Sequence, residues 1–247
     1  MSTAALFAIL AVSSLVTSFI SGILGMAGGM ILMGILLAVV PVPAAMMLHG
    51  FTQLASNGWR AWLWRRHIDW PVFRGYLYGA LAAVAAFTLI RLVAGKAVVL
   101  IVLGLTPFVA LVLPESLHLN VERRGHPVAC GVICTVLQLI AGVSGPILDV
   151  FFVRSKMGRH AVVATKAASQ SAGHTIKIVY FGGIVATASN VSVPMAVMMV
   201  ALAFVGTTFS RFVLEKMDDA SFRKWTRWTV MALGVVYLFS GTLMLLA

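Results

Sequence analysis

Residues 46–59, MMLHGFTQLASNGW, form the centre of a helix of membrane length whose polar side chains are in register. His49, Gln53, Asn57 and Arg60 follow one another at spacings of 4, 4 and 3 residues. An α-helix turns by about 100° per residue, so these four side chains form one stripe along a single face. The stretch therefore predicts a helix that keeps a polar face within an apolar environment.

The polar stripe recurs later in the chain with a constant offset. Each residue of the second stripe lies 117 positions after its counterpart, as 166 − 49 and 177 − 60 show. The same offset relates the glycine-rich segments 25–29 and 142–146, which predicts an internal duplication. The equivalent positions are His49 and Lys166, Gln53 and Gln170, Asn57 and His174, Arg60 and Lys177, Thr52 and Ser169, Gly25 and Gly142, and Gly28 and Gly145.

The composition identifies the class of protein. The chain has 247 residues, of which 61% are hydrophobic and 10% charged, with a mean hydropathy of +1.02. A soluble domain carries about 25% charged residues, so the sequence predicts an all-α polytopic membrane protein. The net charge of +11 does not indicate nucleic-acid binding, because the basic residues lie at the ends of apolar runs, where positive-inside topology explains them.

The apolar runs divide the chain into two repeats of one design. Residues 1–114 form the first repeat, 115–127 a polar connector and 128–247 the second repeat. Each repeat is expected to contain a helical hairpin broken at its glycines, followed by three transmembrane helices. The first helix is expected to be retained rather than cleaved, because no basic residue precedes it and no cleavage motif follows. The expected helices are Ala4–Leu24, Met30–Val40, Ala44–Trp64, Val72–Val93 and Lys96–Leu113, then Val128–Ala141, Ile147–Val153, His160–Phe181, Val193–Leu214 and Phe222–Leu246.

The distribution of basic residues predicts the orientation. An odd number of spans per repeat makes the second repeat insert upside down relative to the first, which is the plan of many secondary transporters. Basic loops then lie in the cytoplasm and uncharged loops outside, with Arg91 and Lys96 as exceptions at the outer surface. The predicted cytoplasmic segments are 65–66, 123–124, 154–159 and 216–227, and the predicted outer segments are 41–43 and 182–192.

The glycine breaks and polar stripes together predict an anion site. A helix that restarts within the membrane directs free N–H groups and a partial positive charge into the break. Amides and hydroxyls on the stripes supply further donors, while His49, Lys166, Lys177 and Arg60 bias the site towards anions. Close helix packing at the glycines and hydrogen bonding between helices are the alternatives. The candidate binding residues are Gly25, Gly28, Gly29, His49, Thr52, Gln53, Asn57, Gly142, Ser144, Gly145, Lys166, Ser169, Gln170 and His174.

Asp149 is the carboxylate that lies well inside an apolar run, and its counterpart is Leu32 (149 − 117 = 32). Asp149 is expected either to pair with Lys166 or to accept a proton that is coupled to anion movement. Four aromatic residues near the stripes could hold an apolar substrate body or belong to the core and the interfacial belt. These residues are Phe51, Trp59, Phe151 and Phe152.

No motif of an enzyme, cofactor site or metal site is found in the sequence, which predicts a protein without catalytic activity. Cys130 and Cys134 lie one helical turn apart within an apolar run. This placement does not suit a disulfide and favours buried thiols, with a redox role or a role towards substrate sulfur as the alternative.

The chain resembles the TauE/SafE sulfite exporter family, also called the 4-toluene sulfonate uptake permease family. The resemblance rests on GILGMAGGMILMGIL (22–36), PVPAA (41–45), TQLASN (52–57), AGVSGPIL (141–148) and SQSAGH (169–174). It implies a multi-pass protein of the cell inner membrane that transports sulfonates, sulfoacetate or sulfite by secondary transport. It places the binding elements at residues 25–29, 52–53, 57, 142–145, 169–170 and 174.

Several functions remain open at this stage. The hypothesis is a carrier for a sulfur-containing anion, with H⁺ or Na⁺ as a coupling ion if the anion is taken up, whereas export could run downhill. The alternatives are a carrier for carboxylate or sulfate, an anion channel, and a membrane scaffold without transport.

Overall fold

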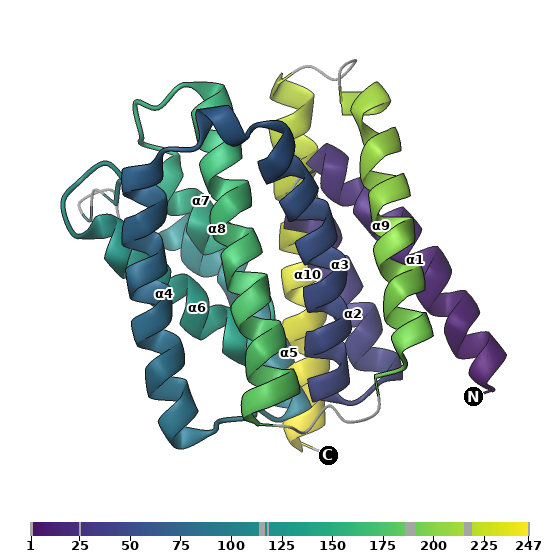
Figure 1. The fold of residues 1–247 in the computed structure, drawn as a ribbon. Coiled ribbons are helices and arrows are strands. Elements are labelled where there is room, and N and C mark those ends of the chain that lie inside the picture. Colours follow the sequence, from purple (N-terminus) through teal and green to yellow (C-terminus); the bar gives the residue numbers. More distant parts are fainter. Residues whose placement is uncertain are drawn as a thin grey trace.

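The computed structural model describes residues 2–24, 26–113, 117, 119–185, 191–214 and 219–246. These residues form helices joined by short connectors, without a strand among them, which confirms the predicted all-helical fold (Figure 1). The helices are α1 Thr3–Leu24, α2 Met26–Val39, α3 Val42–Leu63, η1 Arg65–His67, α4 Trp70–Ile90, α5 Lys96–Val112, α6 His126–Ala141, α7 Gly145–Phe152, α8 Arg159–Val179, the π-helical turn η3 Tyr180–Ile184, α9 Val193–Leu214 and α10 Asp219–Leu246.

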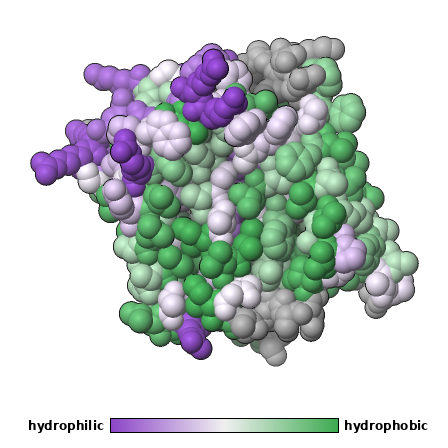
Figure 2. Space-filling view, in the orientation of Figure 1, coloured by the Kyte–Doolittle hydropathy of each residue, from purple (hydrophilic) through white to green (hydrophobic). Residues whose placement is uncertain are grey.

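The outer surface of the helices is suited to a lipid bilayer. Four segments of the described chain are long and apolar enough to cross a membrane, namely α1, α4, Val193–Ser210 of α9 and Lys224–Leu246 of α10. Helices α2, α5 and α6 are apolar but shorter. Figure 2 shows hydrophobic residues along the sides of the helices and hydrophilic residues at their ends. The chain is therefore a multi-pass membrane protein.

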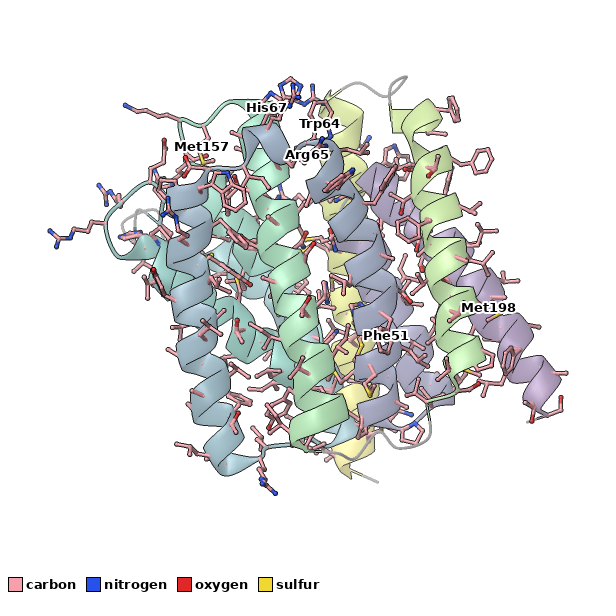
Figure 3. The ribbon with its side chains drawn as sticks, in the orientation of Figure 1. Phe51, Trp64, Arg65, His67, Met157 and Met198 are labelled. Carbon is pink, nitrogen blue, oxygen red and sulfur yellow. The ribbon has the colours of Figure 1, made fainter. Side chains whose placement is uncertain are left out.

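Basic residues gather at one end of the molecule. Arg65 and His67 follow the end of α3, and Figure 3 places both at the same end of the molecule as Met157, which precedes α8. Arg91 lies at the other end of the molecule, because it follows the last residue of α4. The sequence analysis predicts this distribution, with the basic loops at the cytoplasmic end and Arg91 as an exception at the outer end. The side of the membrane stays a prediction, and residues 186–190 and 215–218 of the relevant loops lie outside the described chain.

The contacts between helices show the same pattern when the two predicted repeats are interchanged. In Figure 1, α4, α8, α3 and α9 form the front layer, and the remaining long helices lie behind it. Helix α3 packs on α8 and α5 on α10, while α1 packs on α9 as α4 packs on α6. If α1–α5 correspond in order to α6–α10, each of these contacts is matched by its equivalent. The internal duplication stays a prediction, and this arrangement is the one that two related halves would give.

Helices α3 and α8 run in opposite directions. The rings of Trp64, just after α3, and His160, at the start of α8, stack with a centroid distance of 4.7 Å. At the opposite end, Gly50 of α3 lies against Ile178 of α8. These two helices, which the predicted duplication makes equivalent, are thus antiparallel, as an inverted repeat would require.

Glycines bring α4 and α6 into close contact. A Cβ atom on Gly79 would lie 2.0 Å from the carbonyl oxygen of Val128, and one on Gly131 would lie 2.0 Å from that of Tyr76. Gly75, four residues before Gly79, lies in the same way against Pro127. Small residues at this spacing let the backbones of membrane helices approach each other closely. This close contact with α4 fixes the position of α6. The second glycine break follows directly after α6.

The first glycine break is shorter than the sequence analysis predicts. Helix α2 begins at Met26, so residues 26–29 are helical rather than irregular, and Gly25 lies outside the described residues. Gly28 packs on α1, because a Cβ there would lie 2.1 Å from the carbonyl oxygen of Thr17. This contact supports close helix packing at Gly28, the alternative given in the sequence analysis, and its role in anion binding stays a prediction.

The second break follows the prediction. Helix α6 ends at Ala141, and Gly142 takes a left-handed conformation with φ of 78°, which suits glycine. Helix α7 starts at Gly145 with Pro146 in its first turn, where the missing N–H of proline costs nothing. The chain therefore reverses between α6 and α7 over residues 142–144.

Candidate anion-binding site

A small cavity lies halfway along α3 and α8. Gln53 and Gln170, which both line it, are equally far from the starts of their helices, since 53 − 42 and 170 − 159 both equal 11. The cavity volume is about 20 Å³, enough for about one water molecule. The lining residues are Met26, Gly29, His49, Gln53, Gln138, Val143, Ser144, Gly145, Gln170 and His174.

Two helix starts meet at this cavity. Met26 and Gly29 belong to the first turn of α2, and Ser144 and Gly145 form the start of α7. The two starts are in contact, because a Cβ on Gly145 would lie 2.7 Å from Cβ of Met26. The first N–H groups of a helix have no partner within it and carry a partial positive charge. The cavity therefore receives the positive ends of two helices.

Gln53 brings an unpaired donor to the cavity. Its side chain is 4% exposed, and its Nε2 has no hydrogen-bond partner among the described residues. Asn57 orients Gln53, because its Nδ2 donates to the Gln53 carbonyl oxygen at 3.0 Å and to Oε1 at 3.4 Å. With Oε1 held by Asn57, the Nε2 group is left for a ligand. A buried donor without a partner costs about 1–3 kcal/mol, which a bound acceptor would recover.

Lys177 and His49 connect the two breaks behind the cavity wall. Nε2 of His49 lies 2.9 Å from the carbonyl oxygen of Gly29, so this nitrogen carries the proton and donates it. Nδ1 of His49 then accepts from Nζ of Lys177 at 2.8 Å. Lys177 also donates to the carbonyl oxygen of Gly142 at 2.9 Å. One chain of hydrogen bonds thus runs from the end of α6 to the first turn of α2.

A second network organises the other wall. The hydroxyl of Ser144 donates to Oε1 of Gln138 at 3.0 Å, which fixes the orientation of that amide. Nε2 of Gln138 then donates to Nδ1 of His174 at 2.8 Å, so the neutral ring of His174 keeps its proton on Nε2. The imidazole rings of His174 and His49 lie 5.5 Å apart, centroid to centroid. The two networks therefore meet at the pair of histidines.

The structure brings together about half of the predicted binding residues. Gly29, His49, Gln53, Ser144, Gly145, Gln170 and His174 line the cavity. Asn57 and Gly142 support it from behind through the bonds described above. Thr52 donates its hydroxyl to the carbonyl oxygen of Leu48 at 2.8 Å, and Ser169 is buried away from the cavity lining.

Lys166 and Asp149 form an ion pair outside the cavity lining. This confirms the expected pairing of the two side chains, which are about a third exposed. The predicted role of Lys166 in ligand binding and that of Asp149 in coupling have no contact with the cavity to support them.

The four aromatic residues near the stripes also lie away from the cavity. Phe151 and Phe152 are buried in the cluster formed with Val72 and Tyr76 of α4. Trp59 is 38% exposed and meets Phe204 edge to face. Phe51 lies on α3 outside the lining (Figure 3). The expectation that these residues hold an aromatic substrate is not supported by this arrangement.

Sequence reasoning missed Gln138 in the cavity lining, while Met26 and Val143 fell within the predicted binding segments 25–29 and 142–145 without being named as candidate residues. Gln138 carried a usable signal, because it is an amide within an apolar run, four residues before Gly142, and its counterpart at 138 − 117 = 21 is the polar Ser21. Met26 and Val143 are apolar residues beside glycines and have no such signal.

A helical multi-pass membrane protein with a cavity of hydrogen-bond donors between two helix starts has the arrangement found at the binding sites of many secondary transporters. The chain matches the family described as sulfite exporter TauE/SafE over residues 10–237. The protein therefore belongs to the TauE/SafE family, a family of membrane transporters for sulfite and related anions. No curated protein and no solved structure gave a significant match.

Proposed function

We propose that this protein is a carrier that binds one small sulfur-containing anion between the first turns of α2 and α7. The observation that carries the proposal is the buried, unpaired Nε2 of Gln53 in the cavity lining. Gln170 adds a second amide to the lining, and the starts of α2 and α7 add positive potential. Among the described residues, no carboxylate lines the cavity.

The size of the cavity favours small substrates. A cavity of about 20 Å³ has room for about one water molecule and must enlarge to hold any sulfur-containing anion. Sulfite or a short aliphatic sulfonate requires less enlargement of this space than 4-toluene sulfonate. We therefore favour a small anion over the aromatic sulfonate.

Alternating access would require contacts at each end of the molecule to break in turn. At the arginine-rich end, Trp64 stacks on His160, and the backbone N–H of Asp69 donates to Oγ1 of Thr165 at 2.9 Å (Figure 3). At the other end, the hydroxyl of Tyr180 donates to the carbonyl oxygen of Leu92 at 2.8 Å. Rocking of the two halves about the cavity would open one of these ends while the other stays closed.

The first test is a thermal unfolding screen of the detergent-purified protein. We expect sulfite, thiosulfate, sulfoacetate or a short sulfonate to raise the unfolding temperature, because a ligand at 100 times its Kd stabilises the native state by about 2.7 kcal/mol. Sulfate, acetate and 4-toluene sulfonate serve as comparisons. A shift with acetate and none with sulfur-containing anions would favour a carboxylate carrier.

Transport in liposomes separates a carrier from a channel or a scaffold. A carrier saturates with substrate and exchanges labelled anion by counterflow, whereas a channel does not show counterflow. A scaffold would show no protein-dependent flux.

Asn57→Ala should weaken anion binding through Gln53. The variant removes the Nδ2 group that holds the carbonyl oxygen and Oε1 of Gln53, so the amide is free to rotate away from the cavity. The loss of one orienting hydrogen bond, about 1 kcal/mol, corresponds to a Kd about five times higher. Titration of the thermal shift measures this change. Ser171→Ala, which removes a hydroxyl bonded within α8, is the control and should leave the Kd unchanged.

A further inference from the structure

Lys177 is a buried amine in the middle of the structure without an acidic partner. Its side chain is 0% exposed, and its Nζ donates to Nδ1 of His49 and to the carbonyl oxygen of Gly142. Among the described residues, no carboxylate forms an ion pair with it. Its counterpart Arg60 differs, because it is partly exposed and reaches the carbonyl oxygen of Ser21 at 3.5 Å.

The titratable groups around the Lys177–His49 pair carry no negative charge to neutralise it. The titratable groups on the elements packed around the pair are His174 of α8, whose ring lies 5.5 Å from that of His49, Tyr76 of α4, Cys130 and Cys134 of α6, and Tyr180 of η3, whose hydroxyl donates to the carbonyl oxygen of Leu92. Helix α2 has no titratable residue, and Asp149 of α7 is bound by Lys166. The carbonyl oxygen of Gly142 offers only the partial negative charge of a helix end.

Without an anion in the cavity, these surroundings favour the neutral form of the Lys177–His49 pair. With an anion bound, they favour the form in which Lys177 carries a proton and a positive charge. An ion buried without a counter-ion loses its hydration at a cost of several kcal/mol. A neutral amine has two hydrogens, which match its two acceptors on His49 and Gly142, and a lone pair that can take a proton. An anion in the cavity supplies the missing counter-ion on the other side of the His49 ring.

We propose that the Lys177–His49 pair is the proton-coupling site of this carrier, neutral when the cavity is empty and binding one proton together with one anion. This inference rests on the proposed function and deepens it. A hydronium ion supplies the proton: one of its O–H bonds breaks and leaves a water molecule, while the proton forms a new N–H bond with the lone pair of Lys177 Nζ. Lys177 does not touch the cavity and acts on the anion through the His49 ring.

The charge of the loaded site has two consequences. With a monoanion the loaded site is neutral, so the carrier moves anion and proton together without net charge. A dianion of similar size would leave one negative charge buried, so monoanions should bind more tightly than dianions. Because binding takes up a proton, affinity should fall as pH rises, by up to about tenfold per pH unit.

The test is calorimetric binding of methanesulfonate, a monoanion at every working pH, to the full-length protein in detergent. Titrations in two buffers of different ionisation enthalpy give the number of protons taken up per anion. We expect about one for the wild type and weaker binding of sulfate. In Lys177→Met, which keeps an unbranched side chain but removes the amine, the proton uptake should vanish and the Kd should rise at least about tenfold.

Two further variants keep the test decisive. Lys177→Arg carries a fixed charge and should bind methanesulfonate without proton uptake, even if Lys177→Met folds poorly. Lys156→Met removes an exposed lysine from the loop before α8 and should match the wild type. Size-exclusion chromatography checks that each variant is folded.

Several outcomes would overturn the inference. Anion binding by the wild type without proton uptake would exclude a proton site, and proton uptake that persists in Lys177→Met would place it elsewhere. Uptake that is lost in Asp149→Asn instead would assign the proton to Asp149. If neither methanesulfonate nor any anion of the thermal screen binds to the wild type, the proposed function fails, and this inference fails with it.

Discussion

Replacing Gln53 by leucine is expected to stabilise the protein in the absence of anion and to reduce the stabilisation that anion gives. The Nε2 of Gln53 is buried in the cavity lining without a partner among the described residues. Removing an unsatisfied buried donor relieves a cost of about 1–3 kcal/mol. Loss of the same donor from a bound anion costs about 1.5–3 kcal/mol, which raises Kd about 10- to 150-fold. Thermal unfolding with and without anion measures both effects.

Gln138→Leu is the matched control, because it makes the same chemical change in the same cavity. Both amide atoms of Gln138 have partners, Ser144 on Oε1 and His174 on Nε2. Its loss leaves those two groups unsatisfied, so Gln138→Leu should lower the unfolding temperature where Gln53→Leu raises it. An undiminished anion-induced shift in Gln53→Leu would remove Gln53 from the binding site and with it the main support for the proposed function.

Gly131→Val is expected to prevent stable packing of α4 on α6. A Cβ at this position would lie 2.0 Å from the carbonyl oxygen of Tyr76 and 3.0 Å from the backbone N of Ala80. Both atoms belong to the backbone of α4, so no side chain can move aside and the helices must separate. Overpacking of this kind costs about 3 kcal/mol or more, a large part of the stability of a protein. We expect little monodisperse protein in size-exclusion chromatography and a markedly lower unfolding temperature.

Gly158→Ala is the control for Gly131→Val. Gly158 precedes α8 with φ of −61°, and a Cβ there would meet no atom within 4 Å. Alanine fits this conformation, so the variant should match the wild type or exceed it slightly in stability. A Gly131→Val protein as stable as Gly158→Ala would show that α4 and α6 do not approach each other in this way.

The helices and their order could be predicted because the signals are local. Apolar runs of membrane length, Pro71 and Pro194 near helix starts, and Gly142 after α6 define most boundaries within a few residues. The first break was predicted less well, because a glycine-rich segment is compatible with either an open break or tight packing. The neighbour of Gly28 decides between the two, and that neighbour, Thr17, lies on another helix.

The candidate site was predicted only in part, because it too depends on contacts between different helices. The stripe that carries His49 and Gln53 follows from helical periodicity alone. Periodicity treats Lys166 and Lys177 alike, yet Lys166 pairs with Asp149 while Lys177 turns to His49. The difference depends on which helices surround each lysine.

The sequence by itself determined a multi-pass helical protein with two polar-faced helices and two glycine-rich segments, because hydropathy and periodicity are properties of neighbouring residues along one chain. Only the tertiary structure decided that α2 and α7 start at the same cavity, that Gln53 has no partner there, and that Lys177 lies behind His49. These features depend on contacts between segments more than 100 residues apart, such as His49 and Lys177, whose geometry is set by how the helices pack.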